Sequence, residues 1–485
     1  MASLKGNVVL NGINTVTSIL FPIITFPYAA RVLLPEGIGS INFLQSIINY
    51  IVLLTSLGIP LYAVKEIAKH RDNIEERNKL TIEILILSIL LCFLGYIIVL
   101  ILSICIKKIN SQISTFYILS LTILFTSLGV NWFYQAIEDF KFITVRAIII
   151  RTLSAVSLFV FVHNAKDLNI YAIILVGSTV GNNLINFVHL RKYISINKFK
   201  YDAKNIVKHI KPAAHVFILN IIISLYVQIN TIMLGFMTSD EYVGYLTAGT
   251  KLSTIGETLI YSISTVLLPR CSNLIQNNEL QKFRLIINKS LRLIQLISYP
   301  IIVGGIALAY PIIMVFCGPE YEYSIKILYI HIPVVYFVCL TNLMGIQILY
   351  PLNKINLVIA SVSVGAILNI VLNFFLIPKF QAIGSAITIL LCELSVMIIT
   401  YIIGSRYIPF KFSNIINIKY LSLSLLMGII VYFISVNLDF NIYLNLFVSL
   451  LLGIMLYVSG LIVFKDPFIN EINSQVKKLF IKIKL

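Results

Sequence analysis

Charged residues are scarce in this chain. Asp, Glu, Lys and Arg together make up 12% of the 485 residues, whereas hydrophobic residues make up 59%, and the mean hydropathy is +0.94. A water-soluble globule needs more polar surface than this to cover its exterior. The composition therefore excludes a soluble protein and predicts one that is embedded in a lipid bilayer.

The sequence also lacks the patterns that mark metal, nucleotide and catalytic sites. The cysteines show no spacing typical of metal ligands, and we interpret them as packing residues: Cys92, Cys105, Cys271, Cys317, Cys339 and Cys392. A Walker-type phosphate loop is missing, so no ATP site is predicted. The loops predicted on the outer side are short and carry few charges, which argues against a membrane glycosyltransferase or polymerase. We therefore predict no enzymatic activity, no metal and no cofactor.

Apolar runs of about 20 residues recur along the whole chain, and this is the length of a helix that crosses a bilayer. The pattern predicts an all-α integral membrane protein with about fourteen transmembrane helices. We expect these helices at residues 8–30, 37–59, 80–106, 113–137, 142–162, 169–190, 212–236, 241–268, 286–314, 325–350, 355–377, 381–403, 416–437 and 440–464.

The net charge of +17 is distributed unevenly between the two sides of the predicted membrane protein. Lys and Arg concentrate in alternate loops at 65–79, 191–211, 270–292 and 406–419, and in the tail from residue 465. The other side has few basic residues beyond Arg31, Lys107, Lys108, Lys166, Lys326 and Lys379. By the positive-inside rule, this asymmetry predicts a cell-membrane protein with both termini in the cytosol. It favours anionic lipid headgroups over nucleic acid as partners.

The segment "NWFYQAIEDFKFITVR", residues 131–146, contains the only tryptophan and interrupts the apolar sequence with a cluster of charges. It falls between the fourth and fifth predicted helices, on the cytosolic side. From composition alone, we interpret Trp132, Phe133 and Tyr134 as an aromatic anchor at headgroup depth. The charged residues 138–141 are expected to form the turn that follows.

This segment closely resembles the signature of the polysaccharide repeat-unit flippases. These form the lipid-linked oligosaccharide branch of the multidrug/oligosaccharidyl-lipid/polysaccharide exporter superfamily, in which an Asn/Asp-Trp-Phe-aromatic-Gln-x-x-Glu run precedes the fifth helix. Further segments agree in the same order along nearly the whole chain. They are "ARVLLPEGIGSINF" (30–43), "LGIPLYAVKEIAKHRD" (57–72), "TIMLGF" (231–236), "VLLPR" (266–270), "NLMGIQILYPLNK" (342–354) and "LNFFLIPKFQAIGSAI" (372–387).

The resemblance implies two pseudo-symmetric six-helix bundles around a central cavity, followed by two C-terminal helices. The expected divisions are an N-lobe at 1–195, a C-lobe at 196–405, and a helix pair with a basic cytosolic tail at 406–485. The implied function is movement of an isoprenoid-diphosphate-linked oligosaccharide repeat unit from the cytosolic to the outer leaflet. The movement would proceed by alternating access and serve the synthesis of O-antigen or capsule. Polymerase and assembly proteins are candidate partners.

Rows of polar residues within the predicted helices indicate which faces avoid lipid. Asn14 lies on the first helix, Asn42 and Asn49 on the second, and Asn220 and Gln228 on the seventh, each in a row with helical spacing. Such rows either line a polar cavity or form hydrogen bonds between helices. Both interpretations remain open at this stage.

Charges within the predicted spans are more informative, because each costs about 2.5–3.5 kcal/mol at the bilayer centre. Arg151 in helix 5 and Lys251 in helix 8 each lie about ten residues into the span, roughly 15 Å deep. With one in each lobe, both are candidates to bind a diphosphate. The alternative is a buried ion pair with Glu257 or Glu393. Glu393 is in turn a candidate site for a coupling ion or proton.

A cation-coupled drug exporter of the same fold is the main competing function. Such an exporter is expected to carry a carboxylate on its first helix, in the inner half of the N-lobe. The first helix of this chain contains none. The ordered motifs and the basic residues near the midplane favour the flippase interpretation.

Overall fold

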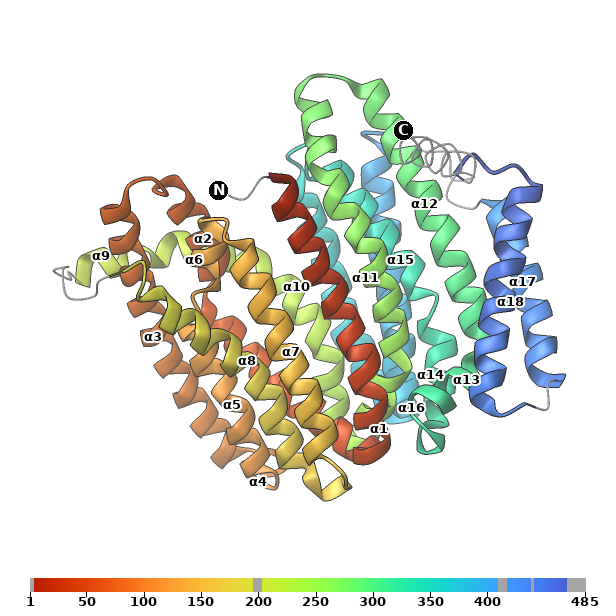
Figure 1. Cartoon of the computed structure of the whole chain (residues 1–485), viewed down its shortest axis with the longest axis horizontal. Helices are drawn as coiled ribbons and strands as arrows, with labels where there is room; N and C mark the ends of the chain where they lie inside the picture. Colours follow the sequence, from red (N-terminus) through yellow and green to blue (C-terminus); the bar gives the residue numbers. More distant parts are fainter. Residues whose placement is uncertain (1–3, 195–202, 409–416, 438–439, 469–485) are drawn as a thin grey trace, which may run out of the picture. The chain divides into compact units, whose positions relative to one another are not determined.

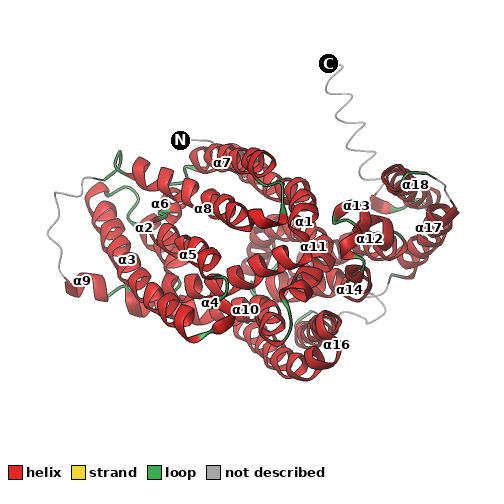
Figure 2. Cartoon of the chain, turned by 90° about the horizontal axis from the view of Figure 1, so that it is seen from below, coloured by secondary structure: helices red, strands yellow, loops and turns green. Residues whose placement is uncertain are grey.

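The computed structural model describes residues 4–194, 203–408, 417–437 and 440–468. Within these ranges every regular element is a helix, and Figure 2 shows no strand among them. The all-α fold class predicted from the sequence is confirmed. A helix satisfies its own backbone hydrogen bonds, which is what a segment surrounded by hydrocarbon requires.

The described residues contain 10 helical segments that are long and apolar enough to cross a membrane. Two of them contain a long helix with an internal break. Helix α1 (Leu4–Ser56) is interrupted at Leu34, and α16 (Ile355–Ser405) is interrupted at Gln381, both with non-helical backbone angles. These breaks fall between pairs of helices expected from the sequence. The total of fourteen crossings stays a prediction.

The chain divides into two compact units. Unit 1 comprises Met1–Ala248 and Ile359–Cys392, and unit 2 comprises Gly249–Val358 and Glu393–Leu485. Helices α11 (Asp240–Gln276) and α16 each run from one unit into the other. The lobe boundaries expected from the sequence remain predictions.

Unit 1 contains α1, the first residues of α11, the middle of α16 and the remaining helices of the first half of the chain. These are α2 (Ile59–Lys69), α3 (Ile74–Cys105), α4 (Lys107–Asn110), α5 (Ile113–Leu128), α6 (Asn131–Ala136), α7 (Phe140–Phe161), the 3₁₀ turn η1 (Ala165–Asp167), α8 (Leu168–Leu190), α9 (Ala203–Val207) and α10 (Ile210–Met237). Helix α5 packs on α8, and α1 packs on α3, α5, α7 and α10 (Figure 1). Helix α1 therefore touches most of the unit.

The aromatic residues of α6 are buried in protein rather than facing lipid. Trp132 is 5% exposed, and Phe133 and Tyr134 are 0% exposed. The Tyr134 hydroxyl donates a hydrogen bond of 2.8 Å to the carbonyl of Asn186 on α8. An interfacial anchor needs rings that touch headgroups, so the interpretation of these residues as an anchor is wrong. Helix α6 packs between α2 and α7, where its rings form a core.

The charged turn after α6 is present where the sequence predicts it. Helix α6 ends at Ala136, and α7 begins at Phe140. The Asp139 carboxylate caps α7 by accepting a hydrogen bond of 3.2 Å from the Phe142 N–H. Glu138 forms an ion pair of 3.1 Å with Arg71. The charges of the segment thus hold the ends of helices in place.

At the opposite end of unit 1, three segments meet at Asp240. Its carboxylate accepts a hydrogen bond of 2.6 Å from Gln112 Nε2 and forms an ion pair of 2.8 Å with Lys108. The α1 backbone approaches α11 so closely here that a Cβ added at Gly39 would overlap the Asp240 carbonyl oxygen. Only glycine leaves room for this crossing.

Unit 2 contains the rest of α11 and α16 together with the helices of the second half. They are α12 (Leu280–Ala307), α13 (Ala309–Phe316), the 3₁₀ turn η3 (Pro319–Tyr321), α14 (Tyr323–His331), α15 (Val334–Asn342), the π-helical turn η4 (Leu343–Leu349), α17 (Ile418–Asn437) and α18 (Ile442–Val463). Helices α17 and α18 match the final pair expected from the sequence and pack on each other, on α12 and on α13. Asp466, which is 1% exposed, accepts hydrogen bonds from Lys419 and Tyr420 and ties the ends of this pair together.

The close crossing at Gly39 gives a first prediction. Gly39→Ala should reduce the yield of folded, monodisperse protein, because the added methyl group must displace backbone and such overpacking costs typically 1–3 kcal/mol. The measurement is size-exclusion chromatography after detergent extraction. Gly177→Ala on α8 is the control, since its Cβ would meet no heavy atom of the described residues within 4 Å. Equal yields of the two variants would contradict the prediction.

Candidate functional site

Arg151 lies in the interior of α7, about 16 Å along the helix from its first residue. Its Nη1 donates hydrogen bonds to Asn14 Oδ1 (3.0 Å), to the Asn14 carbonyl (3.2 Å) and to Thr17 Oγ1 (2.8 Å). The structure therefore brings together two residues of the predicted site, Arg151 and Asn14. The acceptors of these hydrogen bonds are neutral groups on α1. The bonds orient the guanidinium within unit 1.

The other predicted polar residues of α1 are half-buried and bonded along their own helix. Asn42 Nδ2 donates to the Ile38 carbonyl over 2.7 Å, and Asn49 Oδ1 accepts from Gln45 Nε2 over 3.0 Å. Gln228 is half-buried on α10. The side chain of Asn220 lies outside the described residues. The assignment of these residues to a cavity stays a prediction.

The predicted charged residues of the second lobe all belong to unit 2. Lys251 on α11 and Glu393 on α16 are both half-buried. Glu257, one helical turn and a half beyond Lys251, lies close enough to Glu393 for the two carboxyl groups to interact electrostatically. The structure thus gives Glu393 an acidic neighbour, which the sequence separates from it by more than a hundred residues.

A buried amide cluster was missed by the sequence analysis. Asn373 Nδ2 donates to Asn230 Oδ1 and to Asn369 Oδ1, each over 2.8 Å, and all three residues are at most 7% exposed. The cluster joins α10 to α16 within unit 1. The spacing of Asn369 and Asn373, one helical turn apart, was the available signal. Hydrogen bonds of this kind hold membrane helices together.

A second buried network at the α6 end of unit 1 was also missed. The Tyr62 hydroxyl lies 2.6 Å from His209 Nδ1, and His209 Nε2 lies 3.0 Å from Glu83 Oε2. His209 is 1% exposed and Glu83 is 3% exposed. The network joins α2 and α3 to the turn that precedes α10. It therefore holds the start of α10 against the first helices of the unit.

A cavity of about 230 Å³ with a mixed polar and apolar lining lies beside α6. Its hydrophilic lining includes Thr55, Ser88, Ser127, Asn131, Gln135 and Asn183, and Trp132 also contributes. Two residues of the lining, Asn131 and Gln135, belong to the signature segment. The hydroxyl and amide groups can donate and accept hydrogen bonds. They suit a neutral polar guest, such as water or a sugar hydroxyl.

The described residues hold no group of three or more His, Cys, Asp or Glu side chains that would bind a metal. The cysteines are free thiols, and all except Cys105 are buried. The chemistry within unit 1 is instead that of amides, hydroxyls and a few cations placed between helices. Such an arrangement binds and orients polar groups.

Comparison with known protein families matches residues 4–275 to the family described as polysaccharide biosynthesis protein. The chain belongs to this family. The match covers more than half of the chain and includes the signature segment at 131–146. It confirms the relationship that the ordered motifs predict.

Individual proteins agree with this assignment. A protein of Escherichia coli (strain K12), named as a candidate O-antigen transporter, is 25% identical over 81% of this chain and 94% of its own length. A structure of the lipid II flippase MurJ in an inward closed conformation covers 96% of this chain and 99% of its own, with a TM-score of 0.70 and 17% identity. An inward-facing multidrug resistance transporter of the MATE family covers 83% of this chain and 98% of its own, with a TM-score of 0.65 and 14% identity. The two structures show that this chain shares their fold.

The buried network around His209 gives a second prediction. Glu83→Ala should lower the apparent unfolding temperature of the purified protein, because it leaves a buried hydrogen-bonding group without its partner, at a cost of about 1–3 kcal/mol. The measurement is thermal unfolding in detergent. Glu66→Ala is the control, because the Glu66–Lys69 ion pair is exposed to solvent and such pairs contribute about 0–1 kcal/mol. A similar shift for both variants would refute a special role for the network.

Proposed function

We propose that the protein is a flippase for an isoprenoid-diphosphate-linked oligosaccharide repeat unit. It moves this substrate from the cytosolic to the outer leaflet of the cell membrane during synthesis of a surface polysaccharide. The observation that carries the proposal is the family match, supported by the relative named as a candidate O-antigen transporter over 81% of the chain. The likeness to multidrug transporters concerns the fold alone and adds no argument for drug export.

The charge distribution of unit 1 supports an orientation in the membrane. The α6 end includes residues 65–79, 138–146 and 189–194, whereas the opposite end includes 107–115 and 162–169 (Figure 1). The stated ranges at the α6 end contain nine Lys and Arg residues, whereas those at the opposite end contain three. By the positive-inside rule, we propose that the α6 end of unit 1 faces the cytosol. The cytosolic location of both chain termini remains a prediction from the sequence.

The mechanism we propose is alternating access. The diphosphate headgroup enters a cavity that is open to the cytosol and binds to Arg151 and Lys251, while the polyisoprenoid tail stays in the lipid. Asn14, Asn42, Asn49, Asn220 and Gln228 contribute polar lining for the sugars. Rearrangement of the two lobes then exposes the headgroup to the outside. Polysaccharide polymerase and assembly proteins are the partners that would receive the product.

The contacts of Arg151 suit it to this role. All of its hydrogen bonds to Asn14 and Thr17 use Nη1, whereas a guanidinium carries five N–H donors on three nitrogens. The bonds therefore fix the orientation of the side chain and leave Nε and Nη2 to meet a phosphate. Their acceptors are uncharged, so the positive charge is not neutralised by them.

Glu393 is the residue we propose for coupling to an ion. Its neighbour Glu257 carries a second carboxyl group within electrostatic range. Two carboxylates close together in a medium of low dielectric repel each other, and uptake of a proton or a cation relieves this repulsion. Binding of such an ion is a means of driving the conformational cycle.

Substitution of the midplane cations tests the function. Arg151→Gln and Lys251→Gln should each abolish flipping of a lipid-linked oligosaccharide in proteoliposomes while protein abundance stays near that of the wild type. Each change removes attraction for phosphate and also relieves an insertion cost of about 2.5–3.5 kcal/mol. The control is Lys166→Gln in an exposed loop. Loss of the protein itself would show that these cations are structural, and full activity would remove them from the site.

Labelling with an impermeant thiol reagent tests the orientation. In a background without the native cysteines, Ser111→Cys and Lys166→Cys should react in intact cells, because both exposed positions belong to the end predicted to face outward. Asp72→Cys at the α6 end, which is equally exposed, should react only after the cells are permeabilised. The reverse pattern would overturn the orientation and with it the direction of transport.

A further inference from the structure

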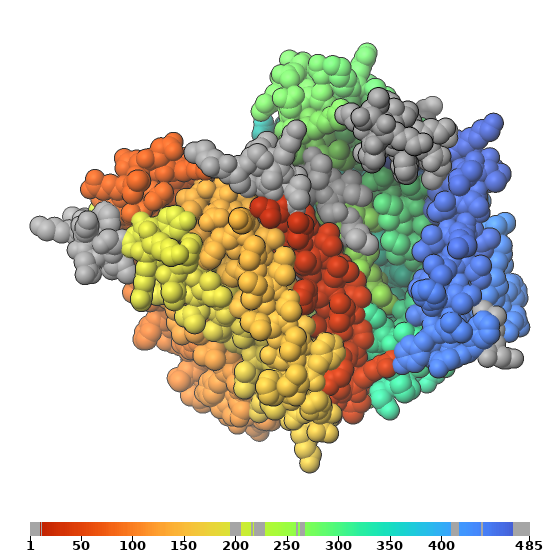
Figure 3. Space-filling model, viewed as in Figure 1, coloured from red at the N-terminus to blue at the C-terminus, as the bar shows by residue number. Residues whose placement is uncertain are grey.

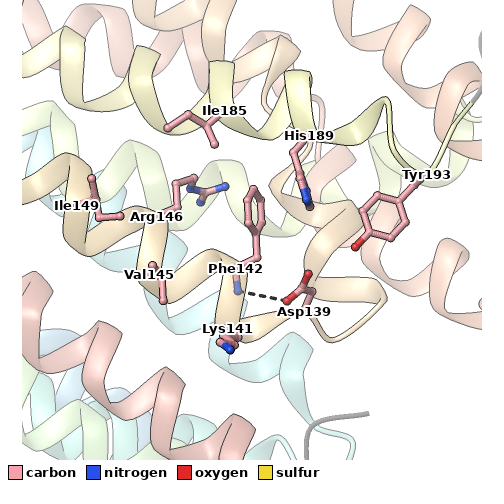
Figure 4. Close-up of a pocket in the computed structure, with 9 residues that line it drawn as sticks. All are labelled: Asp139, Lys141, Phe142, Val145, Arg146, Ile149, Ile185, His189 and Tyr193. Atoms are coloured by element: carbon pink, nitrogen blue, oxygen red, sulfur yellow. Dashed lines mark hydrogen bonds between the residues drawn. The ribbon is translucent and has the colours of Figure 1, made fainter.

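A groove with a volume of about 460 Å³ lies between α7 and α8, at the end of unit 1 where α7 begins and α8 ends. Its polar lining consists of Asp139, Lys141, Arg146, His189 and Tyr193 (Figure 4). Both helices lie at the surface of unit 1 in Figure 3, where they are gold and yellow. The volume falls in the range of sites for single small ligands, about 300–1,000 Å³.

The remainder of the groove is apolar and exposed. Val145 and Ile149 lie one helical turn apart on α7 and are 47% and 52% exposed, and Ile185 on α8 is 38% exposed. Exposed aliphatic side chains on a membrane helix face lipid. The groove therefore opens to the hydrocarbon of the bilayer on one side and to polar groups on the other.

Arg146 is the central polar residue of the groove and is only 8% exposed. Its Nε donates to Asn182 Oδ1 over 3.0 Å, and its Nη2 donates to Asn131 Oδ1 over 3.3 Å. Both acceptors are neutral amides. Its Nη1 has no hydrogen-bond partner among the described residues. A buried cation with an unsatisfied donor is costly, and an anion within reach would offset that cost.

Other donors line the same groove. The Phe142 ring lies between Arg146 and His189 (Figure 4). The Arg146 guanidinium lies 5.4 Å from the centre of the Phe142 ring, and the His189 imidazole stacks on that ring with the two ring centres 4.2 Å apart. His189 Nδ1 also lacks a partner within the described part of the chain. Lys141 is exposed in the first turn of α7. The N-terminal end of a helix, where α7 begins, is itself favourable for negative charge.

The polar groups of the groove lie at or near the ends of their helices. Arg146 lies about 9 Å along α7 from Phe140, whereas Lys141 and His189 lie at the helix ends. Burial raises the pKa of the Tyr193 phenol, and the nearby Asp139 carboxylate raises it further, so this hydroxyl stays a neutral donor. Asp139 Oδ1 accepts the hydrogen bond that caps α7, and Asp139 is the one acidic side chain in the lining of the groove. Donors thus outnumber acceptors at the polar end of the groove.

We propose that this groove is a binding site for the phosphate headgroup of an anionic membrane phospholipid. The buried guanidinium charge of Arg146 and the exposed Lys141 attract the phosphate, and the acyl chains lie along Val145, Ile149 and Ile185. The occupant is a resident lipid of the bilayer, because the groove opens sideways to hydrocarbon. A bound phosphate offsets the buried positive charge of Arg146. It thereby stabilises the contact between the signature helix α6 and helices α7 and α8. The proposal is independent of what the protein transports.

Native mass spectrometry of the full-length protein in detergent tests this site. Titration with phosphatidylglycerol should show saturable binding of a lipid. Phosphatidylcholine with the same acyl chains and free inorganic phosphate should bind at least tenfold more weakly. Arg146→Gln should weaken phosphatidylglycerol binding at least tenfold, whereas Arg191→Gln, an exposed cation at the same end that does not line the groove, should bind like the wild type.

A second variant keeps the test decisive if Arg146→Gln folds poorly. Ile185→Trp fills the apolar half of the groove from an exposed position and leaves Arg146 in place, so it should reduce phosphatidylglycerol binding without loss of folded protein. Equal affinity of the wild type and Ile185→Trp for phosphatidylglycerol would overturn the proposal. The proposal would also be overturned if a polyisoprenyl phosphate bound more strongly than phosphatidylglycerol. The same holds if free phosphate bound as tightly as the lipid.

Discussion

The structure of unit 1 depends on the cost of placing polar groups where water does not reach them. In a bilayer, a polar side chain must find its partner within the protein, because hydrocarbon offers none. Arg151 finds Asn14 and Thr17, and Asn373 finds Asn230 and Asn369. The bonds from Arg151 to α1 and from Asn373 to Asn230 each fix one helix against another. The few polar residues of an apolar chain therefore determine which helices pack together, while van der Waals packing fills the space between them.

The same cost explains how charges are placed at the two ends of unit 1. Asp240 at one end is bound by Lys108 and Gln112, and Glu83 at the other end is bound by His209. Each buried carboxylate joins segments that are more than a hundred residues apart. Because residue 39 is glycine, the backbones of α1 and α11 approach each other closely at Asp240, the residue bound by Lys108 and Gln112. On our proposal, transport uses Arg151, which is held by neutral partners and keeps its charge for a phosphate.

The signature segment shows why composition alone misjudged a site. Aromatic rings next to charges are typical of a membrane interface, and Trp132 and its neighbours were interpreted in that way. Lipid and the interior of a membrane protein are equally apolar, so residue type does not distinguish between them. The structure places these rings in a core between α2 and α7, and it places Asn131 against Arg146. The resemblance to a family identified the segment correctly, although it did not reveal this packing.

The sequence by itself determined the fold class, the positions of most helices and the family. These follow from hydrophobic runs and ordered motifs, which are local properties of the chain. The sequence offered Arg151, Asn14, Glu257 and Glu393 only as single candidates, and the structure brought Arg151 to Asn14 and Glu257 near Glu393. The amide cluster at Asn373, the network at His209 and the groove at Arg146 came from the tertiary structure alone. Their partners are far apart in the chain, and only the packing of helices decides which of many similar polar residues meet.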